Sequence, residues 1–295
     1  MYGLDIPERI IQSAICASHV QGDTPLSINI VGRAGIGKTQ TLLQFTKNKS
    51  IIETSDISQK NLKSHNGTLK REIQLNGLKH IIIPDFIMIM GHKYETVYAT
   101  ITTLNALIEE GLRRSDFYSQ ESSLDTPLFL GVLTSMTFSK FEELFVRFYT
   151  TGFFSRFINV SWAYSDTTNG QIRERINQQM NDHKTIDLSR YTSKTFVFDK
   201  RPSTMISKRM DVMTDKLLRQ QRDFYVSSSH SGYVKTYSLE EGSGNRLSKQ
   251  LWKLVKGIAI SEHPDECVIH DHDMDILDSF LPYVGFKRQE DVIRV

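Results

Sequence analysis

The chain has few cysteines, no long apolar run and no leader-like start, and each shortage excludes a class of protein. Cys16 and Cys267 are its two cysteines and lie far apart in sequence, which favours reduced thiols over a disulfide framework. No uninterrupted apolar run reaches the roughly 18 residues that a membrane-spanning helix needs. The first residues lack the basic start and apolar core of a signal peptide. We therefore expect a cytoplasmic protein that has no membrane partner.

The net charge of the chain is also small. The 295 residues carry a net charge of only +2, which excludes a polycation, and 39% hydrophobic residues are ordinary for a globular chain. The charge is nevertheless uneven, with 12 Lys and Arg against 5 Asp and Glu between Lys200 and Lys256. From Ser261 to Val295 the balance reverses to 3 against 9. The basic segment indicates either a nucleic-acid contact or a solvated helix face.

The most specific motif is Gly-Arg-Ala-Gly-Ile-Gly-Lys-Thr at residues 32–39, a complete Walker A or P-loop pattern. An apolar run over 26–31 predicts a strand before it, and 39–46 predicts a helix after it. These flanks argue against a chance glycine-rich turn. Glycines let backbone N–H groups surround phosphate oxygens, and the helix N-terminus faces the same anion. We predict that ATP is bound by Gly32, Gly35, Gly37, Lys38, Thr39 and Gln40.

A second motif supplies a carboxylate. His80-Ile-Ile-Ile-Pro-Asp85 is a run of β-branched residues ending in an acid, which resembles a Walker B strand. The alternative is a buried strand followed by a turn aspartate. With the P-loop upstream, we predict that Asp85 and the Thr39 hydroxyl hold Mg²⁺, while Lys38 reaches the β- and γ-phosphates.

Strands and helices alternate through the first part of the chain. Further strands are predicted at 51–54, 126–135 and 156–162. Helices are predicted at 6–16, 94–112 and 138–149. This alternation indicates a parallel three-layer α/β sheet. After residues 166–170 the pattern becomes mainly helical, at 171–183, 203–224, 246–260 and 271–282. We therefore expect an α/β nucleotide-binding core over 1–168 and a helical domain over 169–295.

The order of these parts resembles the AAA+ class of P-loop ATPases, and in particular its minichromosome-maintenance (MCM)-like branch. The resemblance is carried by the P-loop, Asp85, the polar strand end at Thr134 and Ser135, the segment Gly152-Phe-Phe-Ser-Arg-Phe157, and Arg246. It implies an AAA+ core with a helical lid that has a winged-helix-like end. It also implies ATP and Mg²⁺ as cofactors and a ring or helical homo-oligomer.

The resemblance also implies roles for individual residues. Thr134 or Ser135 is similar to sensor 1, which positions the attacking water; the alternative is a hydroxyl that caps a turn. Arg156 resembles an arginine finger that acts on a neighbouring subunit's nucleotide, unless it is a structural arginine between two phenylalanines. Arg246, which precedes an amphipathic helix, matches sensor 2, and the alternative is an ordinary first-turn arginine.

One departure from the family pattern concerns hydrolysis. Many AAA+ proteins carry Glu after the Walker B aspartate, whereas here Phe86 follows Asp85. Either turnover is slow or another carboxylate substitutes. Glu109 and Glu110 are the candidates, although exposed acids at a helix end are the simpler interpretation.

Two further clusters invite functional interpretations. The loop arginines Arg113 and Arg114 match basic hairpins that touch DNA phosphates in the MCM-like branch, although such pairs are often merely solvated. His270-Asp-His-Asp273 suggests a metal, but a polar helix N-cap is favoured, because the two histidines would share one side only in a strand.

The function expected from this resemblance is an ATPase that hydrolyses ATP–Mg²⁺ between subunits. The expected output is DNA remodelling or translocation, as in a replication helicase or a helicase-associated motor with replication partners. Two alternatives remain: a MoxR-like chaperone that remodels a protein client, and a slow nucleotide-dependent switch or loader.

Overall fold

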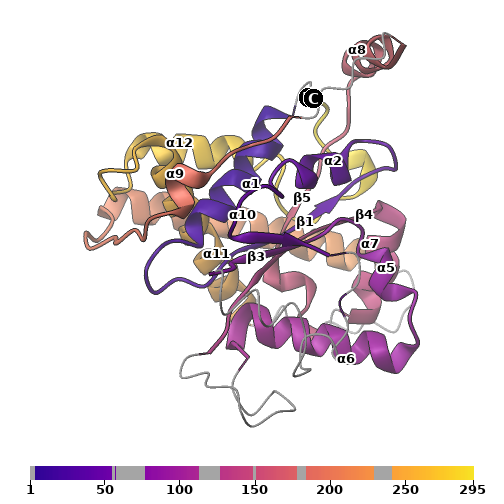
Figure 1. Cartoon of the computed structure of the whole chain (residues 1–295), viewed down its shortest axis with the longest axis horizontal. Coiled ribbons are helices and arrows are strands. Elements are labelled where there is room, and N and C mark those ends of the chain that lie inside the picture. Colours follow the sequence, from indigo (N-terminus) through magenta and orange to yellow (C-terminus); the bar gives the residue numbers. More distant parts are fainter. Residues whose placement is uncertain are drawn as a thin grey trace.

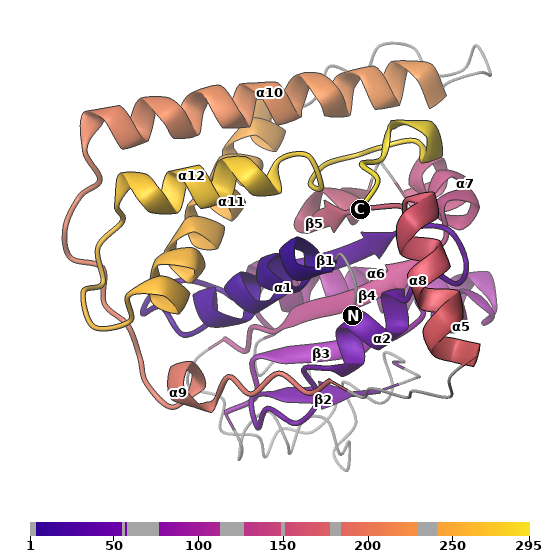
Figure 2. The ribbon, with the colours of Figure 1, turned by 90° about the horizontal axis from the view of Figure 1, so that it is seen from above.

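A five-stranded, all-parallel sheet forms the centre of the computed structural model, with the strand order β2-β3-β4-β1-β5 (Figure 2). The structure describes residues 4–54, 57, 77–112, 127–148, 151–177, 184–228 and 241–295. The strands are β1 (Ser27–Val31), β2 (Ile51–Glu53), β3 (His80–Ile83), β4 (Gly131–Met136) and β5 (Phe157–Val160).

Helices cover the sheet from both sides, and α8 projects away from it (Figure 1). The longer helices are α1 (Asp5–Ala17), α6 (Tyr94–Asn105), α7 (Phe138–Phe148), α8 (Asp166–Asn177), α10 (Thr204–Ser228), α11 (Glu241–Glu262) and α12 (Asp271–Phe280). The shorter ones are α2 (Lys38–Leu43), α5 (Ile87–Met90), α9 (Ser189–Thr192), the π-helix η1 (Ala106–Glu110), and the 3₁₀ turns η4 (Phe154–Arg156) and η5 (Gln289–Asp291). No helix in the described ranges combines the length and apolar character that crossing a bilayer requires.

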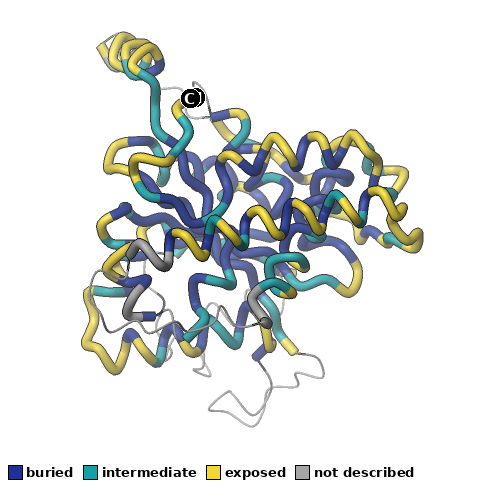
Figure 3. The backbone as a smooth tube through the Cα atoms, turned by 180° about the vertical axis from the view of Figure 1, so that it is seen from behind, coloured by how far each residue is buried: buried dark blue, intermediate teal, exposed yellow. Residues whose placement is uncertain are grey.

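β1, β3, β4 and β5 are buried on both faces, whereas Glu53 at the end of the edge strand β2 is exposed. The all-parallel sheet with helices on both faces confirms the predicted α/β arrangement. Residues on one face join a core with α1, α2, α11 and α12, among them Ile28, Ile30, Leu133 and Ile158. Residues on the other face join a phenylalanine-rich core with α5, α6 and α7, among them Val31, Ile81, Ile83 and Val132. In Figure 3 the buried residues gather around the sheet, and exposed residues recur along the outer helices.

The register of the sheet separates two edges. β1 lies between β4 and β5, and Ser27 at its start pairs with Phe157 at the start of β5. Because all strands are parallel, their carboxyl ends meet at one edge and their amino ends at the other. Gly32 and Asp85 follow β1 and β3 at the carboxyl edge, whereas Arg156 precedes β5 at the amino edge.

The C-terminal helices share a hydrophobic core with the sheet. α11 packs on α1 so closely that a Cβ added to Gly257 would lie 1.9 Å from the Ser13 carbonyl oxygen. The C-terminal segment continues the contact along β5, where the Ser161 N–H donates to the Tyr283 carbonyl at 2.8 Å. The apolar core therefore runs across residue 168, and the expected division into a core and a separate lid stays a prediction.

The predicted strands and long helices are present among the described residues, with shifted ends. α6 stops at Asn105 and the chain continues as a π-helix to Gly111, whose φ of 75° ends it. β4 begins later than predicted, at Gly131, because Leu128 instead pairs antiparallel with Leu112. The four-residue helices α5 and α9 were not predicted, since so short a segment carries no periodic signal.

A buried histidine fixes the amino edge of the sheet. The His80 ring passes over Gly131, where a Cβ would lie 2.5 Å from the ring, and its Nε2–H donates to the Leu26 carbonyl at 3.0 Å. This glycine is therefore required by the close approach. Complete burial lowers the pKa of His80 from 6.5 to about 3, so the folded protein holds the ring neutral.

This burial predicts a loss of stability on acidification. The unfolded chain binds a proton at His80 below its ordinary pKa of 6.5, and the folded chain does so only near 3, so the free energy of unfolding falls through this window. Between pH 7.5 and 5, His80 should remove about 2 kcal/mol. Urea unfolding of the wild type and of His80→Gln at both pH values measures this. An equal pH-dependent loss in both proteins would contradict it.

Candidate functional site

Residues 32–37 form a tight loop between β1 and α2. Gly35 and Gly37 have φ of 79° and 77°, which only glycine adopts without strain, and Gly37 is the N-cap of α2. A Cβ added to Gly32 would lie 2.2 Å from Cδ1 of Ile36, so the end of that side chain would have to move to make room for it. Two of the three glycines predicted from the motif, Gly35 and Gly37, therefore have a conformational reason to be glycine. Gln40 lies exposed in the first turn of α2.

Lys38 bends back over this loop. Its ammonium donates to the carbonyls of Gly32, at 3.1 Å, and Arg33, at 2.7 Å. Partial burial lowers the pKa of Lys38 below its ordinary value, while the charge of Asp85 opposes this shift. The cation is therefore held at the loop and is within the electrostatic influence of the Asp85 carboxylate.

The Pro84 carbonyl brings the ends of three elements together at the carboxyl edge. It lies 3.5 Å from the Thr39 hydroxyl of α2 and accepts a 2.6 Å hydrogen bond from the Ser135 hydroxyl of β4. Asp85 follows it, exposed, and its Oδ1 accepts the Ile87 N–H at 3.0 Å. The two residues predicted to hold Mg²⁺, Thr39 and Asp85, therefore lie at the same edge of the sheet.

The two sensor 1 candidates lie in different surroundings. Thr134 is 1% exposed, and its hydroxyl donates to the Ile83 carbonyl at 2.8 Å within the sheet. The Ser135 hydroxyl shares the Pro84 carbonyl with Thr39. Of these two residues, Ser135 therefore lies closer to the P-loop chemistry, and Thr134 is committed to strand packing.

Phe86 is a packing residue. It is 1% exposed, and its ring packs against that of Phe153 with the two centroids 5.3 Å apart. Its backbone N–H donates to the Ser135 carbonyl at 3.0 Å. The phenylalanine-rich core therefore fixes the position that follows Asp85, and no carboxylate is supplied from there.

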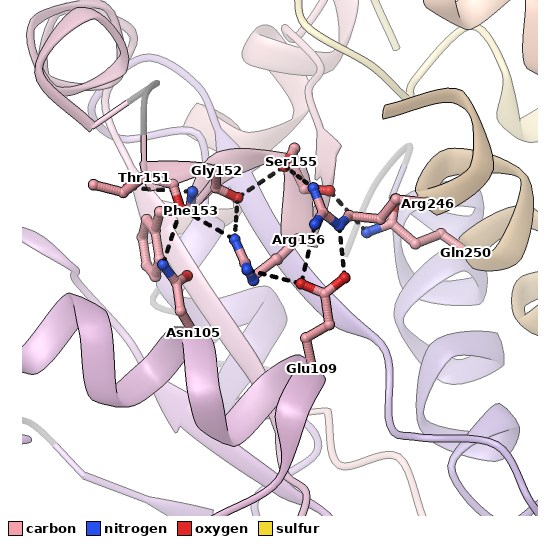
Figure 4. A network of polar contacts seen from close by, with 9 residues as sticks. All are labelled: Asn105, Glu109, Thr151, Gly152, Phe153, Ser155, Arg156, Arg246 and Gln250. Atoms are coloured by element: carbon pink, nitrogen blue, oxygen red, sulfur yellow. Dashed lines mark hydrogen bonds and ion pairs between the residues drawn. The ribbon is translucent and has the colours of Figure 1, made fainter. Parts of the chain in front are cut away.

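At the amino edge, one carboxylate joins two arginines (Figure 4). Glu109, at the end of η1, forms an ion pair of 2.8 Å with Arg156 and accepts hydrogen bonds of 2.8 and 3.1 Å from Arg246. Arg246 also donates to the Ser155 hydroxyl at 2.8 Å, and Arg156 donates to the Gly152 carbonyl at 2.8 Å. We call Glu109, Arg156 and Arg246 the arginine cluster.

The arginine cluster is held by charge as well as by hydrogen bonds. Burial alone would raise the pKa of Glu109, but the hydrogen bond from Arg246 and the charge of Arg156 hold it below its ordinary value. The Arg156 side chain is only 11% exposed, so its guanidinium needs an acceptor nearby. Glu109 accepts from one terminal nitrogen and the Thr151 and Gly152 carbonyls accept from the other, whereas the buried Nε has no hydrogen-bond partner among the described residues.

The predicted site residues therefore form two separate groups. Phe157, next to Arg156, pairs with Ser27, which is five residues before Gly32 along β1. At about 3.3 Å per residue, the two groups are about 16 Å apart along the sheet. Arg156 and Arg246 lie together, and neither contacts the P-loop of its own chain in any hydrogen bond or ion pair recorded among the described residues.

Sequence reasoning did not predict that Glu109 joins both arginines, because its partners are distant in sequence and only their residue types could have suggested pairing. Glu110, the other candidate base, lies exposed beside it. Arg113 and Arg114 lie outside the described residues. The N-cap interpretation of the segment that begins at His270 is confirmed, since His270 is the N-cap of α12.

A scan against protein-family models found no match to this chain, and a search of curated proteins found none either. The functional argument below therefore depends on the geometry of these two groups and on the sequence motifs.

The arginine cluster predicts a stability effect for Glu109→Gln. The substitution removes the negative charge and replaces one of the two acceptor oxygens by an N–H₂ group that faces a guanidinium, so we expect a loss of about 1–3 kcal/mol in the free energy of unfolding. Glu110→Gln is the matched control and should change stability by less than about 0.5 kcal/mol. Urea unfolding compares them, and equal effects in both variants would contradict the cluster's role.

Proposed function

We propose that this chain is an AAA+-type ATPase that completes its ATP site between subunits of a homo-oligomer. One observation carries the proposal. The P-loop and Asp85 occupy the carboxyl edge of the sheet, while Arg156 and Arg246 occupy the amino edge. An arginine about 16 Å along the sheet cannot touch a phosphate on its own P-loop. It reaches one if a second copy packs its amino edge against the first copy's carboxyl edge.

The residues at the P-loop fit a nucleoside triphosphate with Mg²⁺. Gly35 and Gly37 have left-handed backbone conformations and no side chain at these two positions, so backbone N–H groups there can approach phosphate oxygens. Thr39 and Asp85 carry the oxygen ligands that Mg²⁺ prefers. When bound, the ion would neutralise charge on the β- and γ-phosphate oxygens.

In this proposal each site residue has a separate role in ATP hydrolysis. Lys38 leaves the carbonyls of Gly32 and Arg33 and neutralises the γ-phosphate, while Ser135 helps to position the attacking water. Arg156 of the neighbouring subunit stabilises the charge that develops on the transferring phosphoryl group. Arg246 of that neighbouring subunit, which pairs with Glu109 as Arg156 does, approaches the same phosphate.

A slow nucleotide-dependent switch or loader is the second candidate, and the burial of Phe86 favours it. A position occupied by a packed phenyl ring cannot accept a proton from water, and Glu109 is already engaged by two arginines. Slow turnover then follows unless another carboxylate acts as the base.

The preferred output, DNA remodelling or translocation, rests on the family resemblance alone. The basic segment adds little, because Arg209 pairs with Asp275 and Asp278, Arg246 with Glu109, and Lys256 with Asp23. A groove of about 710 Å³ lies beside α10, and its charged lining residues are Lys216, Arg219, Arg288, Asp215, Asp223 and Asp291. Because the three basic and three acidic side chains balance, the groove has no excess positive charge with which to bind a phosphate backbone. A protein client, as for MoxR-like chaperones, is the alternative.

The first test uses Lys38→Ala with Lys49→Ala, an exposed lysine in the loop before β2, as the matched control. Loss of the P-loop cation should abolish ATP turnover and weaken binding of a fluorescent ATP analogue at least tenfold, about 1.4 kcal/mol or more. Lys49→Ala should behave as the wild type. Normal turnover in Lys38→Ala would overturn the site assignment.

Mixed oligomers extend this test to the neighbouring subunit. Arg156→Ala alone should bind ATP normally but lose at least about a hundredfold in turnover. Mixing it with Lys38→Ala should restore activity, because an intact P-loop can then meet an intact Arg156. If the mixture stays inactive while forming oligomers, Arg156 does not act between subunits.

The DNA output predicts that single- or double-stranded DNA raises ATP turnover, and that binding weakens steeply with salt. Filter binding and turnover assays across salt concentrations measure both. If neither binding nor stimulation occurs at low salt, the DNA output should be dropped and protein clients tested.

A further inference from the structure

The loop between α11 and α12 gathers two histidines and a glutamate. His263, Glu266 and His270 each offer a ligand atom within 4.8 Å of the others. The two imidazole rings meet edge to face, with centroids 4.6 Å apart, and His270 Nε2 lies 2.7 Å from Glu266 Oε2. We call these three residues the histidine loop cluster. It belongs to neither group of the candidate ATP site.

A buried aspartate orients the first histidine. His263 Nε2 lies 3.0 Å from both carboxylate oxygens of Asp273, which is 0% exposed. A carboxylate only accepts hydrogen bonds, so this nitrogen carries the proton and Nδ1 presents a lone pair. Nδ1 is buried and has no hydrogen-bond partner among the described residues. An unmet buried acceptor costs free energy, and a metal ion would remove that cost.

The same aspartate also anchors the second histidine. Asp273 Oδ2 accepts the backbone N–H of His270 at 2.8 Å, which fixes the N-cap of α12. One buried carboxylate therefore sets the orientation of His263 and the backbone position of His270. A carboxylate behind a histidine is the usual outer partner of a metal-binding imidazole.

The turn of the loop brings the glutamate to the two rings. The Glu266 N–H donates to the His263 carbonyl at 3.2 Å, and Cys267 follows with a φ of 47°, in the left-handed region that few non-glycine residues adopt. This conformation reverses the chain between His263 and His270. The Glu266 side chain is 59% exposed, so solvent can reach its carboxylate beside His270.

We propose that the histidine loop cluster binds one divalent transition-metal ion of the zinc class. His263 Nδ1, His270 Nε2 and a Glu266 oxygen supply two nitrogens and one oxygen, and water fills the remaining position. Imidazole ligands favour Zn²⁺ over Mg²⁺ or Ca²⁺, which prefer all-oxygen sites. Binding replaces the hydrogen bond between His270 and Glu266, and the neutral His270 ring then carries its one proton on Nδ1.

The bound ion would join the end of α11 to the start of α12. α11 carries Arg246 near its other end, and the 17 residues from there to His263 span about 25 Å of helix. Zinc binding is therefore separate from the P-loop and from the arginine cluster. It clamps the far end of the helix that holds one of the proposed trans-acting arginines.

The test is equilibrium dialysis of chelator-treated full-length protein against Zn²⁺ near pH 7.5, with metal content measured by mass spectrometry. The wild type should bind one equivalent. His263→Ala and His270→Ala should each weaken binding at least about tenfold, since even outer-shell losses cost that much. His272→Ala, an exposed neighbouring histidine, is the matched control and should bind as the wild type does.

Glu266→Gln tests whether any loss of zinc binding comes from the missing ligand or from unfolding, because this exposed side chain can change without disturbing the core. It should also weaken zinc binding, while the melting temperature without metal stays within a few degrees of the wild type. The proposal is overturned if the wild type binds no stoichiometric Zn²⁺. It is also overturned if His272→Ala loses as much affinity as His270→Ala, or if Glu266→Gln and His270→Ala bind normally.

Discussion

Parallel pairing of all five strands is the constraint on which the rest of the structure depends. It places every carboxyl end at one edge of the sheet. That edge therefore holds the P-loop after β1, Asp85 after β3 and Ser135 near the end of β4. The same rule places Arg156, which precedes β5, at the opposite edge. In this register Arg156 lies at the edge opposite its own P-loop, which is why we propose that a second copy supplies the arginine.

Glu109 holds the two arginines of the amino edge in place within the single chain. It neutralises Arg156 and Arg246 at hydrogen-bond distance, so both guanidiniums are already aligned on one side. A phosphate from a neighbouring subunit would have to replace this carboxylate. In the single chain Glu109 therefore serves as the acceptor for both arginines, and in the proposed oligomer the phosphate would take its place.

Much of the fold was predictable because apolar runs and glycine positions are local signals. The P-loop glycines, the buried strand before Asp85 and the long C-terminal helices all followed from patterns within about 15 residues. The partners of Glu109 were not predictable, since residues 109, 156 and 246 are brought together only by the sheet register and the packing of α11. The choice of Ser135 over Thr134 likewise depends on which strand carbonyl each hydroxyl reaches.

The central claim is that the ATP site is completed by a neighbouring subunit, and turnover per subunit as a function of protein concentration tests it most directly. Mass should be measured on the same samples. The account predicts that turnover per subunit rises at least about a hundredfold as monomers assemble, because only then does Arg156 reach a phosphate. Constant turnover per subunit, extending to dilutions at which the chain is monomeric, would contradict it.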